Sequence, residues 1–399
     1  SAAQVNIERE TTLMTKEETQ PLNIDSLLQP ILECEPQNSW PLLLSKLIDS
    51  YPQSAELSYR VAVILEQIGA LPESEKAYFH CLTLAPKNYL VYLYLGHLLE
   101  KKGEDSTALV CYTLCEALTG SFKRLQLTNS TAPQTLERFQ KAWQCMEKNL
   151  GTASSIESAR WVQYCSKPFE TAQSPHLFYV ANLRAHPIWP AEQFAWYESF
   201  NATIPDIIKE FHNTFNSASS HLTPYLSGKE YESAFPMLAN SNNWQALSLF
   251  KEGMEDVSVS KHFPILKKAL EKVPCYGLTA SPYEVFYSKL AKGQTITPHY
   301  GLSNHSLTVH LAIDIPHDCY LDVNGERASW QEHQLTIFDD SYLHMAHNGS
   351  DRDRIVLIFS IWHPDLTSTQ RQAIQSEFKN RQRWIDNLNA ALVQYRNDH

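Results

Sequence analysis

The sequence lacks the features that mark several large classes of protein. No apolar run approaches the ~18 residues that suggest a transmembrane helix, and residues 1–20 lack the apolar core of a signal peptide. The charge balance is acidic, with a formal net charge of −11, and binding to phosphate backbones needs a basic surface. We therefore expect a cytoplasmic chain with no membrane segment and no nucleic-acid partner, although removal of a leader or anchor would leave the same sequence.

The eight cysteines include no Cys-x-x-Cys pair. Cys111 and Cys115 are one helical turn apart, and packing in a helical core explains this spacing more simply than a metal half-site. A reducing compartment is the simplest interpretation. The composition is 43% hydrophobic and 19% charged with no low-complexity tract, so we expect most of the 399 residues to fold, with length enough for two domains.

An internal repeat organises the first part of the chain. Pro52 and Pro86 lie 34 residues apart, which is the period of tetratricopeptide helix pairs, and the same offset aligns Gly69 with Gly103. We predict a tetratricopeptide-like helical domain over residues 24–165. Its role stays open between a scaffold for the next domain and a groove that holds a peptide.

The pattern then changes to short β-type runs separated by turns. Examples are YEVFYSKLA, SLTVHLAIDI, CYLDV, QLTIFDD and RIVLIFSIWH, and the Asn324-Gly325 pair between two runs favours a type I′ hairpin. Many short strands with tight turns indicate a sandwich or barrel. The predicted fold class is α+β, with a disordered segment at 1–23, the helical domain at 24–165, a β domain at 175–368 and a C-terminal helix at 369–399.

Histidines and one arginine fall at the ends or faces of these strands. Redox-active Fe(II) needs imidazole or carboxylate ligands that leave positions open for an oxoacid and dioxygen. A frequent solution places a histidine and an acid two residues apart, with a second histidine far along the chain. Here His299 is followed by Gly301 at the acid position, His344 comes 45 residues later, and Arg354 opens the apolar strand beyond it.

Each of these residues also has a purely structural interpretation. Arg354 could pair bidentately with a ligand carboxylate at the base of a barrel, or it could meet Asp339 or Asp340 at a strand end. His310 could belong to the core. The two aspartates could compete as metal ligands, but paired acids before a turn more often cap it, and His305 could face a substrate.

Several linked motifs carry a resemblance to a known family. HYGLSN, HLAIDIP, FDDSYLH and an arginine followed by WHP, with FYVANLRAHPIWPAEQFAW and YSKLAKGQTITPH upstream, resemble the aspartyl/asparaginyl β-hydroxylase family of Fe(II)- and 2-oxoglutarate-dependent oxygenases. The resemblance covers about residues 175–368 and implies a double-stranded β-helix of the jelly-roll or cupin type. Tetratricopeptide repeats precede this domain in the animal members.

The resemblance also implies roles for individual residues. His299 and His344 would bind iron, with Gly301 where most related oxygenases have an acid. The remaining implied roles concern the cosubstrate: Arg354 and Ser288 for the distal carboxylate of 2-oxoglutarate, His310 for its metal-chelating end, Trp244 beside it and Leu290 in an apolar pocket wall.

The chain departs from the family pattern before its third motif histidine. Ser306 and Thr308 stand where the family usually has arginines. Thr308 replaces a residue expected to hold the chelating end of 2-oxoglutarate, and Ser306 replaces one expected to meet an acidic substrate. Cosubstrate affinity and substrate identity therefore do not transfer directly from the resemblance.

The resemblance implies a dioxygenase that uses Fe(II), 2-oxoglutarate and O2 to hydroxylate an unactivated C–H. The first candidate is the β-carbon of Asp or Asn in a peptide or protein that the repeats help to hold. One alternative is hydroxylation of a lipid acyl chain or small metabolite, since relatives of the family act on lipid A. Another is a catalytically silent binding protein, which the threonine at position 308 favours.

Overall fold

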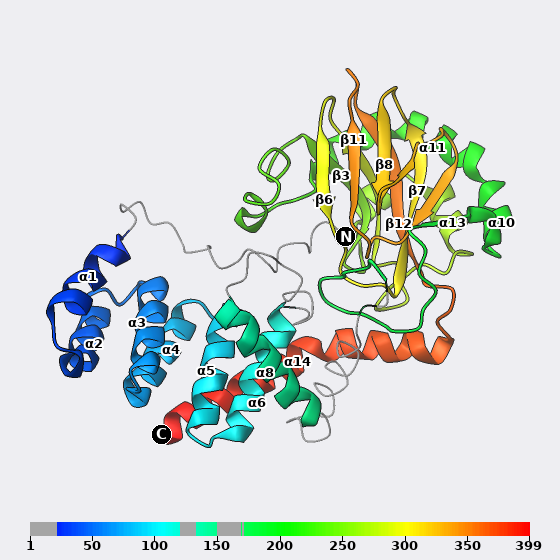
Figure 1. Ribbon diagram of the computed structural model, residues 1–399. Coiled ribbons are helices and arrows are strands. Elements are labelled where there is room, and N and C mark those ends of the chain that lie inside the picture. The colour runs from blue at the N-terminus through cyan, green and yellow to red at the C-terminus, as the bar shows by residue number, and fades with distance from the viewer. Residues whose placement is uncertain (1–21, 120–132, 150–168, 170) are drawn as a thin grey trace. The chain divides into compact units, whose positions relative to one another are not determined.

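The computed structural model describes residues 22–119, 133–149, 169 and 171–399 (Figure 1). These residues form two compact units, a helical unit of residues 22–149 and 383–399 and a β unit of residues 169–382. Residues 1–21 of the segment predicted to be disordered lie outside the described residues. The first helix begins at Ile24, where the Asn23 side chain accepts a hydrogen bond from the Ser26 amide and caps the helix.

The helical unit is a series of short helices in which successive members pack as pairs, α1 on α2, α3 on α4 and α5 on α6. Side chains at Ser54 and Asn88 cap α3 and α5 by accepting backbone hydrogen bonds. The bounds are α1 Ile24–Cys34, α2 Trp40–Ser50, α3 Ala55–Gln67, α4 Leu71–Leu84, α5 Tyr89–Lys101, α6 Asp105–Thr119 and α8 Pro133–Lys148.

The glycines that the 34-residue offset aligns have matching backbone conformations. Gly69 after α3 has φ 81° and Gly103 after α5 has φ 80°, a region that residues with a Cβ rarely adopt. At Gly96, an added Cβ would lie 2.5 Å from the ring of Tyr112, so the close approach of α5 and α6 needs glycine. The paired helices and equivalent turns agree with an internal repeat, and its tetratricopeptide identity stays a prediction.

The β unit consists of two antiparallel sheets. The larger has the order β1-β10-β7-β12-β5-β3-β2, with β4 paired to β3, and the smaller has the order β6-β11-β8-β9. The bounds are β1 Ile188–Trp189, β2 Thr223–Pro224, β3 Trp244–Lys251, β4 Met254–Glu255, β5 Glu284–Leu290, β6 Thr295–His299, β7 Ser306–Asp314, β8 Cys319–Val323, β9 Glu326–Ala328, β10 Leu335–Phe338, β11 His344–Asn348 and β12 Arg354–Trp362.

Strand β12 shows how the core of this unit is built. All nine of its residues are buried, because both faces of the large sheet are covered. Val356 and Ile358 lie in the core between the two sheets, whereas Leu357 and Phe359 lie in a second core under α11 and α13 (Figure 1). For this reason the run RIVLIFSIW is apolar apart from Arg354 and Ser360.

The remaining elements connect or cover the sheets. Asn324 and Gly325 both have positive φ, 54° and 80°, which confirms the predicted type I′ hairpin between β8 and β9. The last helix, α14, contributes residues to both units. The other bounds are α10 Tyr197–Asn201, α11 Ile204–Ala218, α12 Val257–Ser260, α13 Pro264–Leu270, α14 Ser368–Asp398, and the 3-10 turns η3 Gln37–Ser39, η4 Ala191–Gln193, η5 Ser219–His221 and η6 Lys229–Tyr231.

The fold class is α+β, with an N-terminal helical domain followed by a cupin-like β domain, as predicted. None of the helices in the described part of the chain is long and apolar enough to cross a membrane. The cysteines that the structure describes are all free thiols, and Cys111 and Cys115 are buried in the helical unit. Burial raises the pKa of both thiols, which fits a packing role.

Candidate active site

A cavity between the two sheets gathers most of the residues that the sequence singles out. Strands of both sheets line it, so residues far apart in the chain face one another. Seven of the eight predicted site residues are in its wall: His299, His344, Arg354, Ser288, His310, Thr308 and Trp244.

The two proposed metal ligands are cross-strand partners. His299 ends β6 and His344 begins β11, the two residues are paired in the sheet register, and their ring centroids lie 4.2 Å apart. The Nδ1 atom of His299 is 2.7 Å from the Thr297 carbonyl oxygen, and that of His344 is 2.9 Å from the Tyr342 carbonyl oxygen. A carbonyl oxygen can only accept, so each Nδ1 carries the proton and each Nε2 keeps a lone pair.

This arrangement fits a metal. A ligating histidine usually donates its other ring N–H to a carbonyl or carboxylate, which fixes the tautomer and the ring orientation. Burial holds the pKa of His299 well below its ordinary value and lowers the pKa of His344 to about 4, so both rings are neutral at neutral pH, as metal binding requires.

The third protein ligand of the commoner oxygenase pattern is absent at Gly301. A Cβ added there would lie 2.4 Å from Oδ1 of Asp340, so this carboxylate fills the space that a side chain at 301 would need. In the parts of the chain that the structure describes, no group of three or more His, Cys, Asp or Glu side chains is arranged to hold a metal. The residues present therefore fit a metal held by two histidines.

Arg354 is a buried cation at the inner end of the same cavity. Its side chain is 1% exposed, its Nη2 donates to Ser288 Oγ at 2.9 Å, and its Nε has no hydrogen-bond partner. Burial lowers its pKa to about 10, so it remains charged at neutral pH. Within the described residues no carboxylate pairs with it. The alternative that it meets Asp339 or Asp340 is wrong.

The other cavity residues orient polar groups around this arginine. Ser288 Oγ also accepts from Trp244 Nε1 at 3.0 Å, which leaves the serine proton available to a ligand. His310 Nδ1 accepts from Trp330 Nε1 at 3.2 Å, and its pKa is held well below the ordinary value by burial and by Arg354. A neutral His310 therefore carries its proton on Nε2 and presents a donor, unlike the two metal histidines.

Two sequence expectations need correction. Leu290 is fully buried in the core between the sheets but does not line the cavity. His305 is 1% exposed and packs among Phe178, Tyr276 and other rings, so it does not face a substrate. For Asp339, the preferred interpretation that the paired acids cap a turn is confirmed, because its carboxylate accepts hydrogen bonds from the backbone N–H and hydroxyl of Ser341 and from Gln173.

Sequence reasoning also missed functional side chains. Trp330 orients His310 and lies 5.0 Å from the Arg354 guanidinium, yet its segment SWQEH reads as a turn between strands. Glu284 lines the cavity from the first residue of β5. The available signal was strand alternation, which places Glu284 on the same face as Ser288.

Comparison with known proteins finds the same family that the sequence motifs resemble. Residues 201–364 match the model of the family described as Aspartyl/Asparaginyl beta-hydroxylase. Aspartate beta-hydroxylase domain-containing protein 2 of Xenopus tropicalis is 30% identical over 210 residues, which cover 52% of this chain and 55% of that protein. The human protein named Aspartyl/asparaginyl beta-hydroxylase is 25% identical over 341 residues, covering 84% of this chain and 42% of its own length.

The chain thus spans about half the length of the curated relatives it matches. Among solved structures, the cupin domain of Schizosaccharomyces pombe Cnp3 aligns with 38% of this chain and 78% of its own at 12% identity, with a TM-score of 0.22. That score is too low to add to the fold assignment, which rests on the strand pairing. The similarity to the aspartyl/asparaginyl β-hydroxylase family therefore lies in the β unit, where residues 201–364 match the family model.

Proposed function

We propose that the β unit is an Fe(II)- and 2-oxoglutarate-dependent dioxygenase that hydroxylates an unactivated C–H bond in a peptide or protein. The β-carbon of an Asp or Asn side chain is the first candidate, because the matched family is described as an aspartyl/asparaginyl β-hydroxylase. The observation that carries this proposal is Arg354, a buried cation with no carboxylate partner among the described residues. An isolated buried charge is costly, so a site that keeps one is built for an anion.

Different residues of the cavity would bind the two ends of the cosubstrate and the metal. Arg354 and Ser288 would bind the distal carboxylate of 2-oxoglutarate, and the Nε2 proton of His310 would meet its other end. His299 and His344 would hold the metal through Nε2. Bound together, Fe(II) and 2-oxoglutarate supply the means to split O2, with one oxygen atom retained in succinate as CO2 leaves and the other added to the substrate C–H bond.

The cavity wall also protects this chemistry. Phe286, Phe338 and Ile358 line it between the sheets and are almost completely buried. Such walls exclude water and strengthen each electrostatic contact inside. The chain itself therefore contributes orientation, a fixed cation and a dry surrounding.

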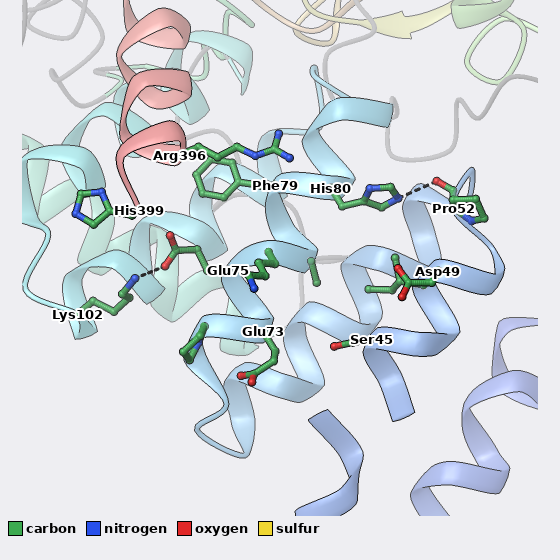
Figure 2. A pocket seen from close by; sticks show the side chains of 14 residues that line it. Ser45, Asp49, Pro52, Glu73, Glu75, Phe79, His80, Lys102, Arg396 and His399 are labelled. Carbon is green, nitrogen blue, oxygen red and sulfur yellow. Dashed lines mark hydrogen bonds and ion pairs between the residues drawn. The ribbon is translucent and has the colours of Figure 1, made fainter. Parts of the chain in front are cut away.

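We further propose that the helical unit recruits the peptide or protein. It carries a pocket of about 570 Å³ between α2, α4 and the end of α14 (Figure 2). Charges of both signs line the pocket, and two interactions brace its walls: Lys102 pairs with Glu75, and His80 Nε2 donates to the Pro52 carbonyl oxygen at 2.8 Å. A polar, mixed-charge pocket suits a peptide better than an acyl chain.

The proposal is tested by metal and cosubstrate binding followed by turnover. Titration calorimetry with Mn(II) and 2-oxoglutarate under anaerobic conditions should show binding of both, and Fe(II) with O2 and candidate peptides should yield succinate. His344→Ala should lower metal affinity by more than the roughly 10- to 100-fold loss that follows removal of a ligand's outer partner. His347→Ala is the matched control, because His347 is on the same strand but outside the cavity.

The alternatives give different results. If the wild-type protein binds neither metal nor 2-oxoglutarate, the oxygenase proposal is wrong and a silent binding protein is favoured. If succinate forms with acyl lipids or small metabolites but with no peptide, the chemistry stands and the peptide substrate does not.

A further inference from the structure

A second cavity of the β unit has an arginine in its wall that is not paired with a carboxylate. This cavity has a volume of about 480 Å³, and the residues that line it differ from those of the active-site cavity. Arg371, in the first turn of α14, is half-buried, and its Nε is buried without a hydrogen-bond partner. Among the residues that the structure describes, its guanidinium forms no ion pair and lies 5.9 Å from the centroid of the Trp362 ring.

The other charged side chains in this wall do not compensate Arg371. Lys267 of α13 lines the cavity but pairs with Glu255, which lies outside it. Glu271 is exposed, and no ion pair joins it to Arg371 in the part of the chain that the structure describes. Burial lowers the pKa of Arg371. A cation that is partly removed from water favours an anion beside it, so a ligand that enters the cavity could supply the missing charge.

The rest of the wall is largely apolar and belongs to elements that are attached to one another. The Trp362 amide donates to the Pro274 carbonyl oxygen at 3.0 Å, which joins the segment after α13 to the end of β12. Gln375 Nε2 of α14 donates to the Gly277 carbonyl oxygen of the same segment at 2.8 Å. The cavity is therefore largely pre-formed, and its volume falls within the roughly 300–1,000 Å³ of small-molecule sites. Its apolar members include Phe250, Leu270, Val273, Pro274, Pro282 and Trp362.

We propose that this cavity binds a carboxylic acid with a small apolar body, and that Arg371 pairs with the carboxylate. A carboxylate fits better than a phosphate, because one planar guanidinium matches one monoanion through two parallel hydrogen bonds. A phosphate dianion would need a second free cation, and Lys267 is already paired. The body of the acid would pack on Trp362 and its apolar neighbours. This site is separate from the proposed active site and goes beyond the proposed function.

The test compares three probes that share a phenyl body and differ in charge: phenylacetate, the uncharged phenylacetamide and the cationic phenethylamine. Binding to the full chain is measured by titration calorimetry. We expect phenylacetate to bind at least about tenfold more tightly than either of the others, because a hydrogen bond to a charged group contributes more than a neutral one. Its affinity should fall as salt rises.

Substitutions assign the binding to this cavity. Arg371→Gln should lower the affinity for phenylacetate by at least about tenfold. Ala280→Trp places a bulky ring at an exposed position of the wall and should block binding while Arg371 stays in place. Arg327→Gln is the matched control, because Arg327 is an exposed arginine over the ring of Tyr320 and outside the cavity. Arg354→Met should also keep the binding, and thermal unfolding shows that each variant is folded.

A peptide that ends in phenylalanine distinguishes two sources of the same carboxylate. If the peptide with a free C-terminus binds as tightly as phenylacetate and its amidated form does not, the terminal carboxylate of a chain can supply the ligand. If both forms bind more weakly than phenylacetate, the site takes a free acid.

Three results would overturn the inference: no saturable binding of phenylacetate at millimolar concentrations, equal or tighter binding of an uncharged or cationic probe, or an affinity that Arg371→Gln leaves unchanged. Binding that is lost in Arg354→Met and kept in Arg371→Gln would place the acid in the active-site cavity instead. None of these measurements involves metal or 2-oxoglutarate, so their failure leaves the proposed oxygenase standing.

Discussion

The two units of this chain treat buried charge in opposite ways. In the helical unit, Glu66 is 3% exposed and is fully compensated: Lys101 lies 2.9 Å from Oε1, Arg138 lies 3.1 Å from the same atom, and the Tyr78 hydroxyl donates to Oε2 at 2.8 Å. In the β unit, Arg354 is equally buried, but among the described residues its only hydrogen-bond partner is the Ser288 hydroxyl. A buried charge that is paired within the protein contributes to the fold, whereas a buried charge without an opposite charge indicates a site for a charged ligand.

The largest expected effect is on the stability of the helical unit, where the charge of Glu66 is compensated. Glu66→Ala leaves Arg138 buried without its carboxylate, because Arg138 otherwise lies over the ring of Tyr94 at 4.0 Å. Breaking a buried pair by removing one partner costs about 3–5 kcal/mol of unfolding free energy. Chemical denaturation followed by circular dichroism measures the loss. A cost below about 1 kcal/mol, the value typical of surface pairs, would show that the cluster is not structural.

Substitution of Arg354 in the β unit should have the opposite effect, with stability kept and ligand binding lost. Arg354→Met removes a cation that has no carboxylate partner in the described structure, so the ligand-free protein should keep its thermal stability or gain some. Affinity for 2-oxoglutarate should fall by about 30-fold or more, since truncating one partner of a buried charge pair costs roughly 2–5 kcal/mol.

Calorimetric titration of 2-oxoglutarate and a thermal unfolding curve, both on the same preparation, separate the two effects. Val356→Ala is the control, because Val356 follows on the same face of β12 and belongs to the core between the sheets. That variant should lose stability and keep binding. A destabilised Arg354→Met protein with normal 2-oxoglutarate affinity would assign the arginine to the fold.

Sequence patterns predicted the parts of the site that are local in the chain. His299, His344 and Arg354 sit at strand ends, where alternation and turn residues mark their place. The family resemblance alone placed Leu290 in the pocket wall, and this was wrong: Leu290 shares the cavity face of β5 but lies one step beyond Ser288, in the core. Strand alternation could not have corrected it, because alternation gives a face of the strand and not a depth along the cavity. Trp330 was missed because it reaches His310 only through the pairing of the sheets.

Contacts between segments far apart in the chain were also beyond sequence reasoning in the helical unit and at Asp340 in the β unit. The 34-residue offset predicted the paired glycines, because turns that need positive φ recur with the repeat. The contact of Glu66 with Arg138 spans two helices of no shared motif, and spacing could not indicate it. Nor could it show that Asp340 fills the space at Gly301, a fact of packing between β10, β11 and the loop after β6.

The smallest expected effect concerns pH. The unfolding free energies of the two units should fall in different pH ranges. Burial depresses the pKa of His344 to about 4, so between the ordinary value of 6.5 and about 4 the unfolded chain binds a proton that the folded β unit does not. Unfolding free energy of the metal-free β unit should therefore fall as pH drops through that range. His299, shifted in the same direction, adds to the fall.

For Glu66, burial raises the pKa, but the hydrogen bonds from Lys101 and Arg138 together bring it below 4.5. Its contribution to the helical unit is complete above 4.5 and is lost only as pH falls through the lowered value. Hydrogen exchange with mass spectrometry, from pH 7 to 4 and corrected for intrinsic rates, resolves the units. Protection should weaken more in β6 and β11 than in α3 and α4, because burial lowers the pKa of several histidines in the β unit but only that of His97 among the described histidines of the helical unit. Equal loss in both units would contradict the assignment of neutral, buried imidazoles to the metal pair. A bound metal should remove the early loss in the β strands, because protons and metal compete for the same two Nε2 atoms.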